Sequence, residues 1–600
     1  MDRRTFIAAT GALAGSALLP ARSLAQGSRA DTAADALYEQ LFQEAVARSP
    51  ELATSLGLDN GARAALKSQL SPRTAAERQK NLAVTRETLR RLRTLDRAAL
   101  SDANKLNTDV LIYSAEAREI APARFGIDSV VRPYPIFQQG GAYFSVPDFL
   151  NSAHTIRTAA DAEAYLARLD AFARVLDDET AEQRAQAARG FLAPGWSLDL
   201  TLVQMRKLRG SPAAEAGLVR SLVTRARAAN IAGDWQGRAT RIVESRVYPA
   251  LDRQIAAIEA LRPSSRAGDG VWRLPDGDAI YAAALEQMTT TTMSPEEVHR
   301  MGLSQVTEIG AELDTILRGE GLAQGSVGAR LALLNARADQ VYPDTAEGRA
   351  ALIESLNEDV RRINAQLPRF FATLPTQPLE IRAVPVEIQD GASNGYYRSA
   401  SLDGSRPAIY FINLKDVRDW PKYTLPALSF HEGNPGHHLQ ISIAQTSRDI
   451  PTLRKLGGFS SYSEGWALYA ESVANEAGVY RTPLERAGFL QSYLFRATRL
   501  VVDTGLHAKR WSREKATDYM VETTGFARPR TQREVERYCT QPGQACSYKV
   551  GHGVWARLRE EAERAQGRRF DVKQFHEVLK EGAMPLTILE RRVRERMRVA

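Results

Sequence analysis

Three of the eight histidines in this chain lie close together, in the segment 431–438, whose sequence is HEGNPGHH. A zinc hydrolase needs two neutral imidazoles, an oxygen ligand, an open position for water, and a carboxylate beside that water. His431 and a second histidine of the segment could bind the metal, and Glu432 could act as the general base. The segment therefore predicts a catalytic zinc site rather than a group of core or helix-capping histidines.

The spacing of these histidines differs from the familiar zinc motif, in which two histidines lie four positions apart on one helical face. His431 and His437 are six positions apart, so on an unbroken helix they would face different directions. Pro435 cannot donate to the carbonyl of His431 and its ring clashes there, which predicts a break in the helix. Gly436 can adopt the dihedral angles that such a break requires. We expect His437 to return to the metal, and His438 is the alternative ligand; the Gly-His step, shared with other zinc peptidases, favours His437.

A third ligand is expected from the downstream segment 462–471, which has the sequence YSEGWALYAE. Its two acids lie among apolar and aromatic residues, where a carboxylate rarely occurs without a partner. We assign Glu464 to the metal. Glu471, two helical turns later on the same face, would accept a hydrogen bond from a ligating histidine and orient it. The alternative for either acid is a solvated helix face.

Helices are expected to dominate the chain from Asp31 to about Leu261, because apolar residues recur there at three- and four-residue spacing. Ala160–Val175 and Leu218–Ala229 are examples. Pro- and Gly-rich stretches at 132–143 and 261–270 interrupt this pattern. Ser294, followed by a proline and two glutamates, is a typical helix N-cap.

Three short segments rich in β-branched and aromatic residues predict strands: Leu379–Ile388, Gly395–Ser399 and Ala408–Asn413. Helical patterning resumes near Tyr423 and continues to the C-terminus. The predicted fold class is therefore mainly α, with one small β-sheet next to the zinc helix. We expect an N-terminal helical region (26–270) and a catalytic region (271–600), the latter with the sheet (379–413) and the zinc-binding helices (423–600), joined in one continuous fold.

The N-terminal residues 1–25 resemble a twin-arginine signal peptide. Arg3 and Arg4 precede an apolar run from Ala8 to Leu19, and Ser-Leu-Ala follows at 23–25 as a cleavage site. This run is shorter than the roughly 20 residues of a spanning helix, so no stable membrane span is expected after cleavage. The twin-arginine export machinery would thus be a partner, and the mature protein would be periplasmic.

The composition is that of an ordinary globular protein, with 44% hydrophobic and 25% charged residues. A net charge of +8 spread over 600 residues is too weak a field to indicate nucleic-acid binding. Cys539 and Cys546 are the only cysteines, and they could form one bridge or remain two inert thiols.

The motifs at 431–440, 463–471 and 499–507 resemble those of the bacterial domain-of-unknown-function family 885, and the resemblance covers nearly all of the mature chain. That family is in turn similar to the mainly helical zinc peptidases typified by neurolysin and thimet oligopeptidase. The resemblance implies a neurolysin-like architecture around one Zn²⁺ per chain and the cleavage of short peptides.

The same resemblance implies a donor to the oxyanion from a later helix. Tyr548 is the candidate, with His552 ranked below it. Arg499, Asp503 and His507 form a stripe at four-residue spacing. Arg499 and His507 could support the site or clamp a substrate terminus; the alternative is a buried structural ion pair.

The preferred function is a metallopeptidase in which water activated by zinc attacks a carbonyl and Glu432 is the general base. Hydrolysis of a non-peptide amide or ester is an alternative, and the sequence does not separate exopeptidase from endopeptidase action. A further alternative is a non-enzymatic periplasmic metal- or peptide-binding protein. Glu432 argues against it, because a structural zinc site has no use for a carboxylate next to a ligand.

Overall fold

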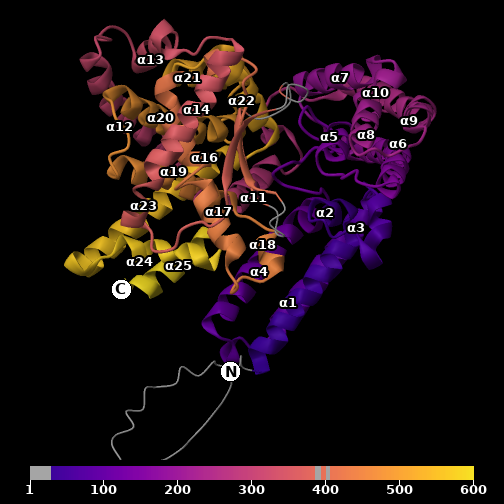
Figure 1. Ribbon diagram of the computed structural model, residues 1–600, viewed down its shortest axis with the longest axis horizontal. Coiled ribbons are helices and arrows are strands. Elements are labelled where there is room, and N and C mark those ends of the chain that lie inside the picture. The colour runs from indigo at the N-terminus through magenta and orange to yellow at the C-terminus, as the bar shows by residue number, and fades with distance from the viewer. Residues whose placement is uncertain (1–28, 385–388, 390–393, 401–405, 600) are drawn as a thin grey trace, which may run out of the picture.

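The structure is a computed structural model that describes residues 29–384, 389, 394–400 and 406–599 (Figure 1). The predicted signal peptide lies outside these residues. Within them the chain is mainly helical, with one small three-stranded sheet, as the sequence predicts.

Three long helices, α1, α3 and α4, and a compact helical group make up the N-terminal part. Of the three, α4 lies nearest the C-terminal helices, and α5 to α10 gather towards the opposite, upper right side of the molecule (Figure 1). The predicted helices at 160–175 and 218–229 are α6 and α8. The bounds in this part are α1 (Arg29–Arg48), α2 (Pro50–Ser55), α3 (Ala75–Arg93), α4 (Asp102–Ile120), α5 (Ala142–Ser152), α6 (Ala159–Ala188), α7 (Gly195–Gly210), α8 (Gly217–Ala228), α9 (Trp235–Ile242) and α10 (Tyr248–Leu261).

The remaining helices surround the sheet and the histidine segment. Ser294 caps α12 as predicted, since its hydroxyl accepts a hydrogen bond from the amide of Glu297. The bounds are α11 (Gly277–Thr289), α12 (Pro295–Gly319), α13 (Val327–Asn335), α14 (Ala346–Asn364), α15 (Leu367–Phe370), α16 (Leu425–Glu432), α17 (His437–Thr446), α18 (Thr452–Lys455), α19 (Ser460–Glu476), α20 (Pro483–His507), α21 (Arg513–Thr524), α22 (Arg528–Thr540), α23 (Ser547–Gln566), α24 (Val572–His576) and α25 (Leu586–Met597).

The sheet consists of β1 (Leu379–Ala383), β2 (Gly395–Arg398) and β3 (Ala408–Ile412), in the order β1-β3-β2. β3 runs parallel to β1 and antiparallel to β2. Each of the three predicted segments contains a strand, but each strand ends before the predicted last residue; residues 385–388 of the first prediction lie outside the described part of the chain. β3 is almost wholly buried, as its central position requires, and the chain passes from it towards α16.

Two large hydrophobic cores hold the molecule together. One is built from residues of the segment 70–284, and the other is centred on α19 and α23, where Trp466 packs against Trp555. α19 and α23 cross with their backbones in contact. A Cβ on Gly465 would lie 2.4 Å from the carbonyl carbon of Gly551, so only glycine permits this approach. The crossing fixes the position of Glu464 relative to Tyr548, which lies one turn before Gly551.

Within the described ranges, no helix combines the length and the apolar composition that a membrane crossing requires. Cys539 and Cys546 are both buried free thiols, so the bridge between them is not formed.

Candidate metal centre

The predicted helix break separates α16 from α17 at residues 433–436. Gly436 lies so close to the preceding turn that a Cβ there would be 2.0 Å from the carbonyl oxygen of His431. The indole N–H of Trp466 donates to the carbonyl of Pro435 over 2.9 Å and ties the break to α19. The two histidine-bearing helices are thereby held against the helix that carries Glu464.

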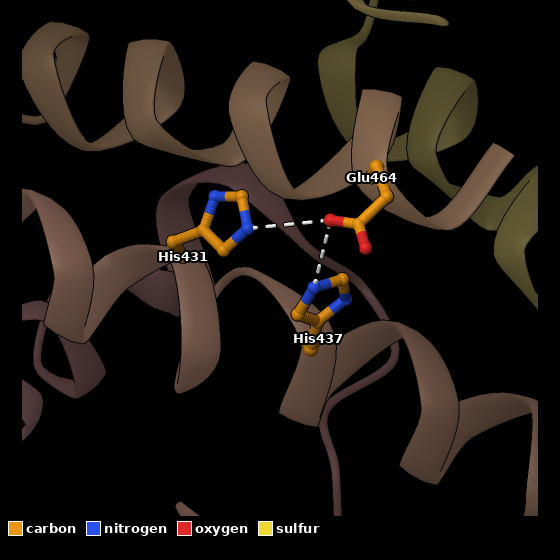
Figure 2. Close-up of side chains that lie close together, drawn as sticks. All are labelled: His431, His437 and Glu464. Atoms are coloured by element: carbon orange, nitrogen blue, oxygen red, sulfur yellow. Dashed lines mark ion pairs between the residues drawn. The ribbon is translucent and has the colours of Figure 1, made fainter. Parts of the chain in front are cut away.

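The break brings His431, His437 and Glu464 together (Figure 2). Oε2 of Glu464 lies 3.5 Å from Nε2 of His431 and 3.3 Å from Nε2 of His437. Bonds of about 2.0–2.2 Å around a tetrahedral ion place neighbouring ligand atoms about 3.3–3.6 Å apart. The glutamate-to-histidine separations therefore fit one shared metal ion, and two imidazoles with one carboxylate form a suitable donor set for zinc.

Glu471 fixes the orientation of His431. Its Oε1 accepts a hydrogen bond from Nδ1 of His431 over 2.8 Å, which leaves Nε2 with its lone pair directed into the cluster. Without metal, burial lowers the pKa of His431, but the hydrogen bonds to Glu464 and Glu471 outweigh burial and raise that pKa to about 9. Burial alone would raise the pKa of Glu464, yet the charges of His437 and His431 hold it well below its usual range.

His438, the alternative ligand, lies outside this cluster. Its Nε2 is 3.1 Å from the carbonyl oxygen of Gln377, and its Nδ1 is 3.2 Å from the hydroxyl of Tyr397. Both ring nitrogens thus have partners of their own, and burial lowers the pKa of the ring to about 4. Of the two candidate second ligands, the structure places His437 beside Glu464.

Glu432 is the last residue of α16 and follows His431 directly. Its side chain is buried but is not one of the clustered ligands. Within the described part of the chain its carboxylate has neither an ion pair nor a hydrogen bond to another side chain. Burial, and then the charge of Glu432, raise the pKa of the Tyr410 hydroxyl on β3 well above its ordinary value. The carboxylate of Glu432 therefore lies near Tyr410 of β3, without a side-chain partner among the described residues.

Tyr548 approaches the cluster from α23. Burial raises the pKa of its phenol, and the negative charge of Glu464 raises it further, so the hydroxyl remains a donor at neutral pH. The guanidinium carbon of Arg499 lies 4.6 Å from the centre of the Tyr548 ring and 4.3 Å from that of Phe495. Arg499 thus packs against the candidate oxyanion donor.

The other two residues of the stripe, Asp503 and His507, make contacts within the fold. Nδ1 of His507 accepts a hydrogen bond from the amide of Val271 over 3.0 Å, and its Nε2 contacts the carbonyl of Tyr538 at 3.0 Å. Asp503 accepts from the hydroxyl of Tyr281 over 2.8 Å. Both nitrogens of His507 are thus bound to backbone groups. These contacts agree with the structural alternative for His507, and its role at the site stays a prediction.

The sequence did not predict the role of some residues next to the site. Trp466, which holds the helix break, was visible only as an aromatic residue beside Glu464. Arg496 packs beside Arg499 on Phe495, and Arg530 packs on Phe526. The three-residue spacing of Arg496 and Arg499 on α20 was the available signal for Arg496.

Comparison with known proteins gives the chain a family. Residues 50–593 match the model of a bacterial protein family of unknown function, DUF885. The crystal structure of a "putative lipoprotein" from Colwellia psychrerythraea is 31% identical with a TM-score of 0.90, covering 95% of this chain and 99% of its own. A "putative lipoprotein of unknown function" from Shewanella oneidensis shares the fold at 17% identity and a TM-score of 0.70, covering 92% of this chain and 98% of its own. No curated protein matches the sequence. Since the family model covers more than half of the chain, this protein belongs to the DUF885 family.

Proposed function

We propose that this protein is an exported zinc-dependent hydrolase, and specifically a metallopeptidase that cleaves short peptides. The observation that carries the proposal is the cluster of His431, His437 and Glu464, in which both histidine nitrogens lie at ligand-to-ligand distance from one carboxylate oxygen. Glu432, adjacent in sequence and outside the cluster, supplies the carboxylate that a catalytic site needs and a structural site does not.

Zinc, when bound by the two imidazoles and Glu464, would lower the pKa of a water molecule and polarise a substrate carbonyl. Glu432 accepts the proton of the attacking water and delivers it to the leaving amine. Tyr548 donates its phenolic proton in a hydrogen bond to the carbonyl oxygen as negative charge develops there. Glu471 keeps the imidazole of His431 in the tautomer that presents Nε2.

Two finer features of the proposal rest on resemblance. Along the chain, His431 and His437 lie on either side of Glu432, and Glu464 follows on a later helix. This order of the ligands supports a neurolysin-like zinc-peptidase architecture. The likeness to a "putative lipoprotein" and the paired Arg3 and Arg4 support export, and we place the mature protein in the periplasm after passage through the twin-arginine machinery.

Metal analysis joined to a peptide scan tests the proposal. The mature chain is purified, its metal content is measured, and a library of short peptides is screened with native, chelator-treated and zinc-reconstituted protein. We expect about one zinc per chain and hydrolysis that chelation abolishes and zinc restores. A protein without metal and without hydrolysis would overturn the proposal. Zinc with peptide binding but no turnover would favour the binding-protein alternative, and turnover of amides or esters alone would redirect the substrate class.

A further inference from the structure

Three arginine side chains gather around one aromatic pair beside the candidate metal centre. Phe495 of α20 and Phe526 pack edge to face, with ring centres 5.4 Å apart. Arg499 lies 4.3 Å and Arg496 5.6 Å from the Phe495 ring centre, and Arg530 of α22 lies 4.2 Å from that of Phe526. We call these residues, Arg496, Arg499 and Arg530, the arginine cluster.

The positive charge of the cluster is only partly neutralised. Glu534 lies 3.1 Å from Nη2 of Arg499, but the same oxygen is also 2.9 Å from Nη2 of Arg537. One carboxylate therefore serves two guanidinium groups.

The other two members of the cluster have no ion pair within the described ranges. Arg496 donates to the hydroxyl of Ser492 over 2.6 Å, and Arg530 donates to the backbone carbonyl of Asp419 over 2.8 Å. Their hydrogen-bond partners are neutral. The carboxylates of Asp419 and Glu534 act on Arg530, but the guanidinium groups of Arg496, Arg499, Arg530 and Arg537 outnumber these two acids, so a net positive charge remains at this place.

Each arginine of the cluster also carries a buried nitrogen for which the described residues provide no acceptor. These nitrogens are Nε of Arg496, Nη1 of Arg499 and Nε of Arg530. Arg499 is only 6% exposed, so its Nη1 is a deeply buried donor. Unpaired Nε atoms also occur on Arg78, Arg273, Arg362 and Arg454, whereas Nη1 of Arg499 is the one terminal guanidinium nitrogen without an acceptor among the buried atoms of the described residues. A buried terminal donor of this kind is ordinarily paired, and together with the neighbouring guanidinium charges it indicates a place for an anionic acceptor.

The arginine cluster contacts Tyr548, the candidate oxyanion donor, through Arg499. The guanidinium carbon of Arg499 is 4.6 Å from the Tyr548 ring centre. A substrate whose carbonyl reaches Tyr548 would therefore extend towards these arginines.

We propose that Arg496, Arg499 and Arg530 bind the C-terminal carboxylate of a peptide, so that cleavage occurs near the C-terminal end. The inference rests on the proposed peptidase function and specifies its substrate class. Planar guanidinium groups match a carboxylate through paired N–H donors, and every short linear peptide with a free C-terminus carries one close to its last peptide bonds.

Equilibrium binding tests the proposal without turnover. Three acetylated tripeptides are used in calorimetry: a free acid, its C-terminal amide, and an amide whose last residue is aspartate. The protein carries Glu432→Gln, and each titration is repeated after metal removal. We expect the free acid to bind about ten-fold more tightly than either amide, with and without metal, because a charge-assisted hydrogen bond contributes at least that much.

Substitutions test whether the arginines cause the preference for the free acid. In the same background, Arg496→Gln and Arg530→Gln are each expected to reduce the preference for the free acid several-fold. Arg499 is not substituted, because its loss would leave Glu534 with one cationic partner fewer in a buried place. Arg486→Gln is the matched control, since Arg486 lies on the same helix but is exposed and pairs with Glu312.

The outcomes separate the two proposals. Equal affinity for acid and amide, or a preference that survives both substitutions, would overturn the carboxylate site. Tightest binding of the aspartate amide would overturn the C-terminal assignment in favour of an acidic side chain. Turnover of amidated peptides as fast as of free acids would overturn this inference while leaving the peptidase standing. A preference for the free acid in a protein that hydrolyses no peptide would support the site and reject the peptidase.

Discussion

The carboxylate of Glu471 accepts the Nδ1 proton of His431 over 2.8 Å, from a position on α19 that is fully buried. A histidine that ligates a metal commonly donates its other ring N–H in this way, and the acceptor raises the basicity of the ligating nitrogen. The pair therefore connects α16, which carries the candidate ligand His431, to α19, which carries the candidate ligand Glu464.

Glu471→Gln is expected to weaken metal binding about 10- to 100-fold, because the neutral amide no longer supports the imidazole. Competition with a chromogenic chelator measures the affinity. Glu476→Gln on the same helix is the control, because Glu476 is exposed and pairs with Arg559. Equal affinities of Glu471→Gln and the parent protein would show that the carboxylate only fills the core.

His437→Ala and His438→Ala are expected to differ in metal content. His437 places Nε2 3.3 Å from Glu464, whereas both nitrogens of His438 are engaged by Gln377 and Tyr397. The first variant should lose the metal and the second should retain about one ion per chain. Elemental analysis of the dialysed proteins decides between them, and the opposite pattern would make His438 the ligand.

Metal binding at pH 7.5 is expected to release about one proton from His431. In the metal-free protein burial lowers the pKa of this ring, but Glu464 and Glu471 raise it to about 9, above its ordinary value of 6.5. The proton on His431 thus stabilises the metal-free fold fully below pH 6.5, and this contribution is lost as the pH rises through about 9.

Calorimetry of zinc binding in buffers of different ionisation enthalpy measures the protons released. The contribution of His431 to this release should disappear as the pH rises well above 9, where the ring is already neutral. Identical heats in all buffers at pH 7.5 would contradict the prediction.

The sequence predicted those features that local physics determines. Ser294 caps its helix because the hydroxyl and the amide it binds are three residues apart. The break at residues 433–436 follows from a proline and two glycines within one turn. His431, His437 and Glu464 could be proposed as ligands because each sits in a short motif whose chemistry is visible without the fold.

The features that the sequence did not predict depend on which helices pack together. The four-residue spacing placed Arg499 and His507 on one face of α20, but it could not reveal that Val271 and Tyr538 cover His507 with backbone groups. Arg530 reaches the arginine cluster from α22, and no pattern in the sequence connects it to Phe526 and α20. Such relationships are set by tertiary packing, and periodicity carries no information about the partner.

Glu432→Gln is expected to lower turnover of the best library peptide about 10²- to 10⁴-fold, the usual contribution of a positioned acid-base group. The amide keeps the shape of the side chain but cannot accept a proton. Metal content should remain at the parent value, because Glu432 lies outside the ligand cluster. A variant that retains full turnover would exclude Glu432 as the base, and a variant that loses its metal would instead make Glu432 a ligand.

Tyr548→Phe is expected to lower kcat about 10²- to 10³-fold while KM changes little, because the phenol stabilises charge that develops mainly in the transition state. The substitution retains the ring against which Arg499 packs, so the arginine should keep its position. Steady-state kinetics on one peptide measure both constants. Tyr248→Phe is the control, because it removes a hydroxyl that donates to the carbonyl of Ser211 in the N-terminal helical group. If kcat survives in Tyr548→Phe, the oxyanion donor is another group; if KM rises while kcat is unchanged, Tyr548 binds the substrate in its ground state and does not assist the chemical step.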